Sequence, residues 1–330
     1  MINRKKTAVF VLALVSVMAL IVAPFFGGSA NAIADSNGIA SINTKLIMLE
    51  LRLPRILLAY IVGAALAVSG MTFQSLFKNS LATPFTLGVA SGASLGVAVT
   101  TVFGISFSML FISSQVLFAF VGALLAVALV YMLGRINRVN GAATTLLSGV
   151  AVSFTFSSLI LCIQYISDKT DSYRIIRWLM GGLATVGYSE VLTLLPFVLT
   201  GLVVVFIFRK ELDLFSLGDE FAISRGVDVR LVQRLLFLAT SLMIAGVVSI
   251  CGPIGFVGMM APHIVRMLIG AGHTLLFWGV LMFGGVFMVF CDFCSRVVIF
   301  PVFIPVGIVT ALLGGPFFVW LTVSKRSNYS

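Results

Sequence analysis

The sequence predicts an all-α polytopic membrane protein with about ten transmembrane helices and both termini in the cytoplasm. Hydrophobic residues make up 60% of the 330 residues, charged residues make up 10%, and the mean hydropathy is +1.16. Soluble domains carry about a quarter charged residues, so this composition is typical of a membrane protein. The apolar residues form long segments, and the basic residues stand singly or in small groups at the ends of those segments.

The net charge of +10 does not indicate a nucleic-acid partner, because the basic residues are scattered and have no aromatic residues between them. The cysteines lack the spacing of a disulfide framework. Cys291 and Cys294 form a C-x-x-C pair, but no second pair or histidine lies nearby in the sequence. We interpret them as small buried residues and expect neither a metal site nor a cofactor.

The first predicted span covers about residues 8–26 and follows the basic cluster at 4–6, which places its amino end inside the cell. Residues 30–32 have the small-x-small pattern of a signal-peptidase site. The preceding apolar run is long enough to cross a bilayer, so we interpret it as a retained helix. An outer loop is expected at 27–50.

The second span opens at Leu51, with Pro54 suited to a first helical turn. Small residues, which let membrane helices approach closely, recur in this span at Gly63, Ala64, Ala67 and Gly70. A tight inner turn is predicted at 78–84. The third span follows, and its four-residue repeat of Gly88, Gly92 and Gly96 also predicts close packing.

The remaining predicted spans are about 115–133, 144 to before 168, 191–208, 235–251, 252–269 after a break at Gly252-Pro253, 275–294 and 305–323. A short interfacial helix is expected at 174–188, before the sixth span. We treat residues 1–330 as a single transmembrane domain.

The distribution of the basic residues tests this assignment of spans and loops to the two sides of the membrane. Fourteen of the 21 lysines and arginines fall on the cytoplasmic side and seven fall outside. This two-to-one bias follows the positive-inside rule. An even number of spans, with both termini inside, therefore fits the sequence.

A charged stretch at 213–232, which we call the elbow, separates the sixth and seventh spans. Ser216 and Asp219 have the spacing of a capping box, and Gly226 can end a helix. Asp228 can then cap a second helix that continues into the seventh span. Such a rigid elbow would suit a membrane protein that is pushed by a soluble partner. On spacing alone, a solvated connector is an equal alternative.

The sequence lacks two features by which a membrane transport protein could energise transport itself. No carboxylate falls near the middle of a predicted span, and the closest, Asp292, lies at the outer end of the ninth. Ion-coupled carriers usually need such a group. The sequence also has no G-x-x-x-x-G-K-[ST] motif for binding nucleotide. Energy for transport is therefore expected to arrive from a partner, through the elbow.

Six stretches in the same order carry a resemblance to a known family. They are RLPR at 52–55, GAALAVSG at 63–70, NSLATP at 79–84, LGDE at 217–220 with GV at 226–227, GPIGFVG at 252–258 with PHIVR at 262–266, and PVGIVT at 305–310. Over about residues 45–323 the chain resembles the membrane subunits of ABC importers for ferric siderophores, haem and vitamin B12. Ser80 departs from the family, which more often has proline there.

The resemblance implies a type II ABC importer permease fold of ten helices. It implies a dimer with a second permease subunit, identical or related, in the lipid of the cytoplasmic membrane. Two ATPase subunits are expected beneath the dimer and a substrate-binding protein outside. The function that it implies is alternating-access import of an iron chelate, a ferric siderophore or haem, with ATP hydrolysed by the partner. This subunit would then not itself be an enzyme.

The resemblance also implies roles for individual residues. The binding protein is expected to dock on Arg52, Arg55 and Arg296, although arginines that anchor the helices at the interface remain an alternative. The expected contacts with the ATPase are Leu217, Gly218, Asp219, Glu220, Ala222 and Gly226. The expected inner gates are Asn79 with Leu81, and Thr144 with Thr145. His263 is interpreted as structural or interfacial.

Other functions stay open. A vitamin B12 (cobalamin) importer would share the same permease pattern. An ion-coupled secondary transporter would transport without an ATPase and would be expected to carry a charge within a span. An intramembrane enzyme would need a paired catalytic constellation, which neither His263 nor the Cys291 and Cys294 pair provides within its segment.

Overall fold

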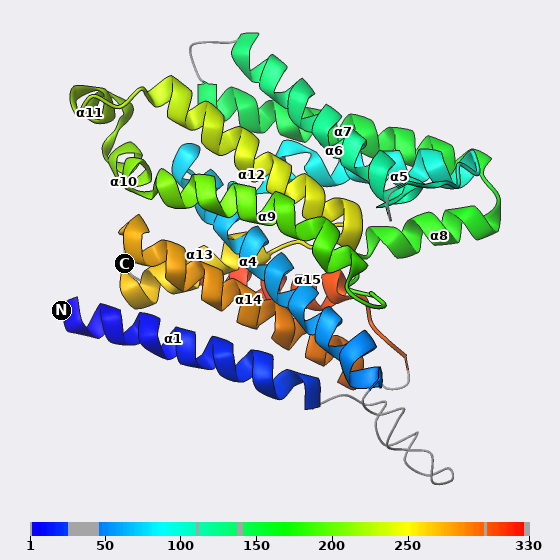
Figure 1. Ribbon diagram of the computed structural model, residues 1–330. Helices are drawn as coiled ribbons and strands as arrows, with labels where there is room; N and C mark the ends of the chain where they lie inside the picture. Colours follow the sequence, from blue (N-terminus) through cyan, green and yellow to red (C-terminus); the bar gives the residue numbers. More distant parts are fainter. Residues whose placement is uncertain (1, 26–45, 110–111, 137–140, 300–301, 327–330) are drawn as a thin grey trace.

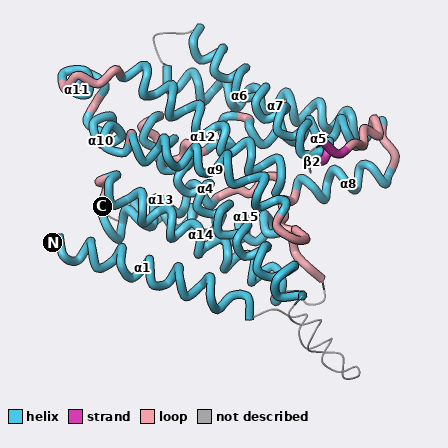
Figure 2. The backbone as a smooth tube through the Cα atoms, in the orientation of Figure 1, coloured by secondary structure: helices cyan, strands magenta, loops and turns pink. Residues whose placement is uncertain are grey.

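The computed structural model describes residues 2–25, 46–109, 112–136, 141–299 and 302–326 (Figure 1). Its elements are α1 (Ile2–Val22), η1 (Ala23–Phe25), η2 (Met48–Arg52), α4 (Leu53–Leu76), η3 (Pro84–Leu87), α5 (Val89–Val102), β1 (Ser108–Met109), β2 (Ile112–Ser113), α6 (Ser114–Ile136), α7 (Gly141–Ile166), α8 (Lys169–Leu179), α9 (Ser189–Ile207), α10 (Arg209–Leu217), α11 (Asp219–Ser224), α12 (Val229–Cys251), α13 (Val257–Ile269), α14 (His273–Val297) and α15 (Val306–Arg326). Most of the described residues are helical, and the strands among them form one short antiparallel pair, β1 and β2 (Figure 2).

The helices confirm the predicted fold class. Seven of them, α1, α4 extended by η2, α6, α7, α9, α12 and α14, are long and apolar enough to cross a membrane. Three shorter apolar helices, α5, α13 and α15, lie where the third, eighth and tenth spans were predicted. The elbow lies at the same end of the bundle as both termini (Figure 1). We call this the inner end, and the opposite end the outer end.

Helix α4 forms the centre of the molecule. Of its most apolar window, 83% is buried, whereas the corresponding value for the peripheral α7 is 17%. Helices α9, α12, α13 and α14 surround it. The reason is the run of small residues, because a Cβ atom at Gly63 would overlap the carbonyl oxygen of Gly284, and one at Gly70 would overlap that of Gly258. The close packing predicted for this span is confirmed.

The glycine repeat of the third span serves two purposes. A Cβ at Gly92 would overlap the carbonyl of Gly122 in α6, and one at Gly96 would overlap that of Phe118. These two glycines therefore form the predicted close contact. Gly88 differs, because its φ of 75° lets η3 pass into α5.

The chain is not helical between α12 and α13, as the Gly252-Pro253 pair predicted. Gly252 has a φ of 69° and Phe256 a φ of 67°. The amide of Gly182 donates to the carbonyl oxygen of Cys251 at 2.8 Å, and that of Gly307 donates to Gly181 at 3.4 Å. The turn at Gly181 thus meets the end of α12 and the start of α15, which satisfies part of its backbone.

Two predicted boundaries are wrong. The helix expected at 174–188 is α8, which begins at Lys169 and ends at Leu179, because Gly181 turns the chain with a φ of 66°. The outer loop expected at 27–50 ends earlier, because residues 46–52 are already helical and continue into α4. Residues 30–32, with the signal-peptidase pattern, lie outside the described residues.

Candidate functional site

The elbow consists of two short helices, α10 and α11, separated by Gly218 with a φ of 125°. The predicted capping box between Ser216 and Asp219 is wrong. Helix α10 extends through Ser216, so the side chain of Ser216 bonds within α10. Its hydroxyl donates to the carbonyl oxygen of Asp213 at 2.6 Å. Gly218 precedes α11 instead, without a side-chain cap.

The other two predicted helix signals of the elbow are confirmed. Gly226 follows α11 with a φ of 80°, the left-handed conformation that ends helices. The carboxylate of Asp228 accepts a hydrogen bond of 3.1 Å from the amide of Leu231 and so caps α12. Because α12 then runs unbroken to Cys251, the elbow continues directly into a membrane span.

The elbow has its own packed core. Leu212, Phe215 and Ala222 are at most 1% exposed, and they belong to one apolar cluster with Val229 and Leu236 of α12. Such packing makes α10, α11 and the start of α12 resist independent movement. A force on the elbow would therefore move these helices together.

The residues expected to contact the ATPase differ in exposure. Leu217 is 68% exposed, Glu220 and Gly226 are also exposed, and Gly218 is partly so. Asp219 is half-exposed and forms an ion pair of 2.9 Å with Lys78. Ala222 is fully buried, so any effect of it on a partner must act through the shape of the elbow. These contacts stay predictions.

The inner turn between α4 and η3 carries the first predicted gate. Lys78 has a φ of 49°, and the side-chain carbonyl oxygen of Asn79 accepts a hydrogen bond of 2.9 Å from the amide of Leu81. This local bond shapes a tight turn. Leu81 is 54% exposed at its tip. Thr83 then caps η3 with a reciprocal hydrogen bond to Thr86.

The second predicted gate lies in the first turn of α7. Thr144 and Thr145 are both half-buried there. The hydroxyl of Thr145 faces α6, where it lies beside Gly134. The gating role of both threonines stays a prediction.

A polar chain at the inner end joins three helices, and the sequence analysis did not find it. The Nδ1 atom of His273 lies 2.6 Å from a carboxylate oxygen of Asp213 in α10, and its Nε2 atom lies 2.6 Å from the hydroxyl of Ser75 in α4. The backbone amide of His273 donates to the same oxygen of Asp213 at 2.8 Å. No local pattern links residues so far apart in the chain.

The arginines expected to dock the binding protein occupy different environments at the outer end. Arg52 donates a hydrogen bond of 3.1 Å to the carbonyl oxygen of Pro24. Arg55 and Arg296 both form ion pairs with Asp292, at 2.8 Å and 3.0 Å. The side chain of Arg55 is 21% exposed, but that of Arg296 is only 9% exposed. Docking on these residues stays a prediction, and Arg296 is the more deeply buried of the two arginines paired with Asp292.

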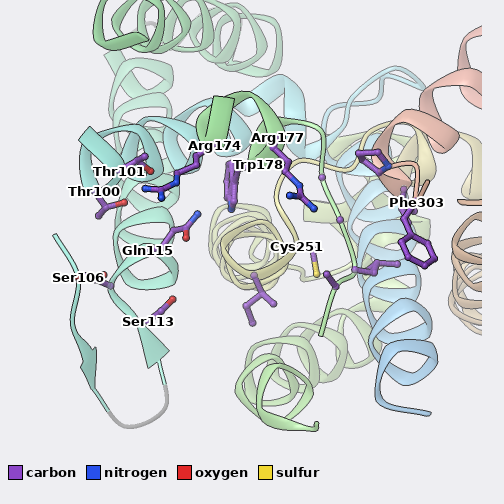
Figure 3. A pocket seen from close by; sticks show the side chains of 18 of the residues that line it. Thr100, Thr101, Ser106, Ser113, Gln115, Arg174, Arg177, Trp178, Cys251 and Phe303 are labelled. Carbon is purple, nitrogen blue, oxygen red and sulfur yellow. The ribbon is translucent and has the colours of Figure 1, made fainter. Parts of the chain in front are cut away.

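A cavity of about 1140 Å³ opens near the outer end (Figure 3). Helix α8, the residues after α5, the start of α6 and the irregular segments around Gly181, Cys251 and Pro305 form its wall. Arg174 and Arg177 reach into it from α8 beside Trp178, and Phe303 lies on the other side (Figure 3). Its volume is that of a site for a large organic ligand.

The charge of this cavity is positive. Arg55, Arg174 and Arg177 line it, and no described carboxylate does. Arg55 is paired with Asp292 and Arg174 with Asp171. Arg177 is exposed and has no ion-pair partner among the described residues. Guanidinium groups next to a tryptophan favour an anionic ligand with a flat apolar part.

The cysteines form no metal centre in the described part of the chain. All four are free, and Cys251 and Cys291 are buried. Among the described residues, no three or more histidine, cysteine or acidic side chains lie close enough together to hold a metal. His263 packs against the ring of Phe317, with the ring centroids 6.1 Å apart.

A bundle with several helices long and apolar enough to cross a membrane, an elbow continuous with one of them and a large cavity at the outer end are features that suit a membrane transport subunit. The FecCD transport family matches residues 8–324, and the chain belongs to this family. It has the helical fold of a type II ABC importer permease.

Individual relatives agree with this assignment. The hemin transport system permease protein HmuU of Yersinia pestis is 37% identical over 86% of this chain and 85% of its own length. The cobalamin import system permease protein BtuC of Halobacterium salinarum is 38% identical over 84% of this chain and 73% of its own. A solved inward-facing putative metal-chelate type ABC transporter matches with a TM-score of 0.86 and 30% identity, covering 97% of this chain and 99% of that one.

Proposed function

We propose that this chain is the membrane subunit of an ABC importer that carries an iron chelate, a ferric siderophore or haem, across the cytoplasmic membrane. A separate ATPase pair drives the transport, and this chain hydrolyses no nucleotide. The observation that carries the proposal is the match to a metal-chelate type transporter over nearly the full length of both chains. A second permease subunit and an outer substrate-binding protein complete the assembly.

The positive outer cavity supports an anionic chelate as cargo. Arg174 and Arg177 supply positive charge, and Trp178 and Phe303 supply apolar surface. Ferric citrate is an anion, and haem carries carboxylates on a flat ring, so either suits this lining.

The mechanism is alternating access without covalent chemistry in this subunit. The loaded binding protein docks at the outer end. ATP-driven closure of the ATPase pair then pushes on Leu217 and Glu220, which the elbow exposes. Since the elbow is packed against α12, which Asp228 caps, the movement reaches the membrane spans rather than being lost in a loop.

Cobalamin import is the second candidate, because a cobalamin permease is as similar to this chain as a hemin permease. The charge of the cavity favours the anionic chelate. An ion-coupled carrier is disfavoured, because the one carboxylate buried in α14, Asp292, is already engaged by two arginines.

Reconstitution tests this proposal. The chain is co-expressed with its ATPase and binding protein, purified as a complex and placed in liposomes. Uptake of radiolabelled ferric citrate, haemin and cobalamin is then measured with ATP, without ATP, and with an ion gradient alone. We expect ATP-dependent accumulation of an iron chelate and none with the gradient.

The controls decide between the alternatives. Liposomes with the permease but without the ATPase should accumulate nothing. ATP-dependent uptake of cobalamin alone would establish the second candidate. Accumulation without the ATPase, driven by a proton or sodium gradient, would contradict the importer mechanism.

A further inference from the structure

The inner end of α4 is held by the elbow at two separate points. Ser75, in the last turn of α4, meets His273, which meets Asp213 of α10. Three residues further along, Lys78 of the inner turn meets Asp219, the first residue of α11. Each helix of the elbow therefore has its own polar link to the segment that carries Asn79 and Leu81.

The first link runs through a buried side chain. His273 is 3% exposed, and its ring lies between a carboxylate and a hydroxyl at 2.6 Å each. Because a carboxylate only accepts hydrogen bonds, Nδ1 is the donor to Asp213. The backbone amide of His273 adds a second bond to the same oxygen. Because His273 makes two hydrogen bonds to Asp213, both the distance and the orientation between the two residues are restrained.

The second link lies in a strained turn. The Nζ atom of Lys78 is 2.9 Å from a carboxylate oxygen of Asp219, and both side chains are 47% exposed. Lys78 takes a left-handed backbone conformation with a φ of 49°, which is uncommon for a residue with a side chain. A pull on its ammonium group acts directly on the turn that holds Leu81.

The hydrogen-bonded residues of the first link do not form a hydrolase active site. Ser75, His273 and Asp213 have the residue types of a catalytic triad. However, Ser75 is 8% exposed and its hydroxyl also lies 3.0 Å from the carbonyl oxygen of Met71 in its own helix. A substrate would not reach this serine, so the chain of hydrogen bonds acts as a mechanical connection.

We propose that Ser75, Lys78, Asp213 and His273 are positioning residues that transmit movement of the elbow directly to the inner gate turn. This inference rests on the proposed function, and it adds a route that does not pass through α12. The α12 route moves a span, whereas these two links move the end of α4 and the turn beside it. Transport would then lose its coupling when both links are cut, even with α12 intact.

The test follows two positions in the reconstituted complex by spin labels. One label is attached at Leu81→Cys, at the tip of the gate turn, and the other at Leu231→Cys, at the start of α12; these residues are 54% and 49% exposed. Cys162→Ser removes the exposed native thiol. The Ser75→Ala and Lys78→Gln changes cut the two links, and Thr72→Val is the control, because Thr72 is buried in α4 but its hydroxyl bonds only within that helix.

In the labelled complex with both links intact, and in the same complex with the Thr72→Val control change, ATP binding should change the spectra of both labels. With Ser75→Ala and Lys78→Gln combined, the label at position 81 should lose its response while the label at 231 keeps it. In the double variant without the two label cysteines, uptake per ATP hydrolysed should fall at least several-fold compared with the original sequence, with ATPase association unchanged.

Three results would overturn the inference. A full response at position 81 in the double variant would show that α12 alone moves the turn. Loss of both responses together with loss of ATPase association would show that the links only hold the fold. An unmodified chain that recruits no ATPase would overturn the proposed function itself, and with it this inference.

A further variant separates the two hydrogen bonds of the first link. The asparagine of His273→Asn can still bond to Asp213, in place of Nδ1, but it does not reach Ser75. This variant should therefore weaken the response of the label at position 81 as Ser75→Ala does.

Discussion

The Nε atom of Arg55 in α4 lies 2.8 Å from a carboxylate oxygen of Asp292 in α14, an ion pair across two helices that are packed at their glycines. The second oxygen of Asp292 faces Arg296, four residues on in the same helix. The carboxylate is 1% exposed, so both arginines compensate a buried charge. The pair fixes the outer ends of α4 and α14 against each other.

Removing this carboxylate should destabilise the protein strongly. In Asp292→Asn, Arg296 stays buried with no opposite charge, and we expect a loss of about 3–5 kcal/mol in the free energy of unfolding. Thermal unfolding in detergent, followed by intrinsic fluorescence, measures the change. The control is Asp171→Asn, which breaks the exposed pair with Arg174 and should cost about 1 kcal/mol or less. Equal melting temperatures for the two variants would contradict the buried-pair argument.

The contact between α4 and α13 should not tolerate a methyl group. Gly70→Ala places a Cβ atom against the backbone of Gly258, which cannot move without moving α13. We expect destabilisation of about 3 kcal/mol or more and poor recovery from the membrane. The matched control is Gly315→Ala in α15, where a Cβ atom meets nothing within 4 Å. Size-exclusion profiles and membrane yield of the two variants provide the comparison.

A bulky residue on the exposed face of the elbow should uncouple transport. In Glu220→Trp we expect the protein to insert normally while uptake falls at least roughly tenfold, because the elbow no longer fits its partner. Glu220→Ala separates the loss of charge from the added bulk and should have the smaller effect. Co-purification with the ATPase and uptake in liposomes measure the two steps. Normal uptake by Glu220→Trp would remove this face from the interface.

The charge of the outer cavity should affect uptake of an anionic cargo. Arg177→Gln removes the exposed lining cation that has no ion-pair partner among the described residues, and we expect uptake of ferric citrate to fall roughly three- to tenfold. Lys169→Gln is the control, since Lys169 is an exposed cation in the same helix but does not line the cavity. The ATPase rate should stay unchanged in both. An equal loss in both variants would indicate a general effect of surface charge.

Part of the fold could be predicted because the bilayer imposes it. The length of the apolar segments gave the spans, and the positions of Gly63, Gly70, Gly92 and Gly96 gave the close contacts, since only small residues let backbones approach. The cap at Asp228 and the turn at Gly226 were also predictable, because each depends on neighbours within a few residues.

The sequence was misleading where a local pattern competed with a longer helix. The spacing of Ser216 and Asp219 suggested a capping box, but α10 continues through Ser216, and its hydroxyl bonds back to the carbonyl oxygen of Asp213. The interfacial helix was predicted too far along the chain, because α8 ends before Gly181, which turns the chain with a φ of 66° and packs so close to Pro253 that a Cβ atom there would overlap the carbonyl oxygen of Pro253.

By itself the sequence determined the class of protein, the approximate spans and the charged elbow between the sixth and seventh of them, because hydrophobicity, charge and caps act within one turn or one span. Only the tertiary structure decided that Arg296 is buried against Asp292 and that Ala222 lies inside the elbow. It also decided that Asp213, His273 and Ser75 are joined by consecutive hydrogen bonds. These partners come from different helices, and a hydrogen bond or an ion pair between them depends on packing that no local pattern records.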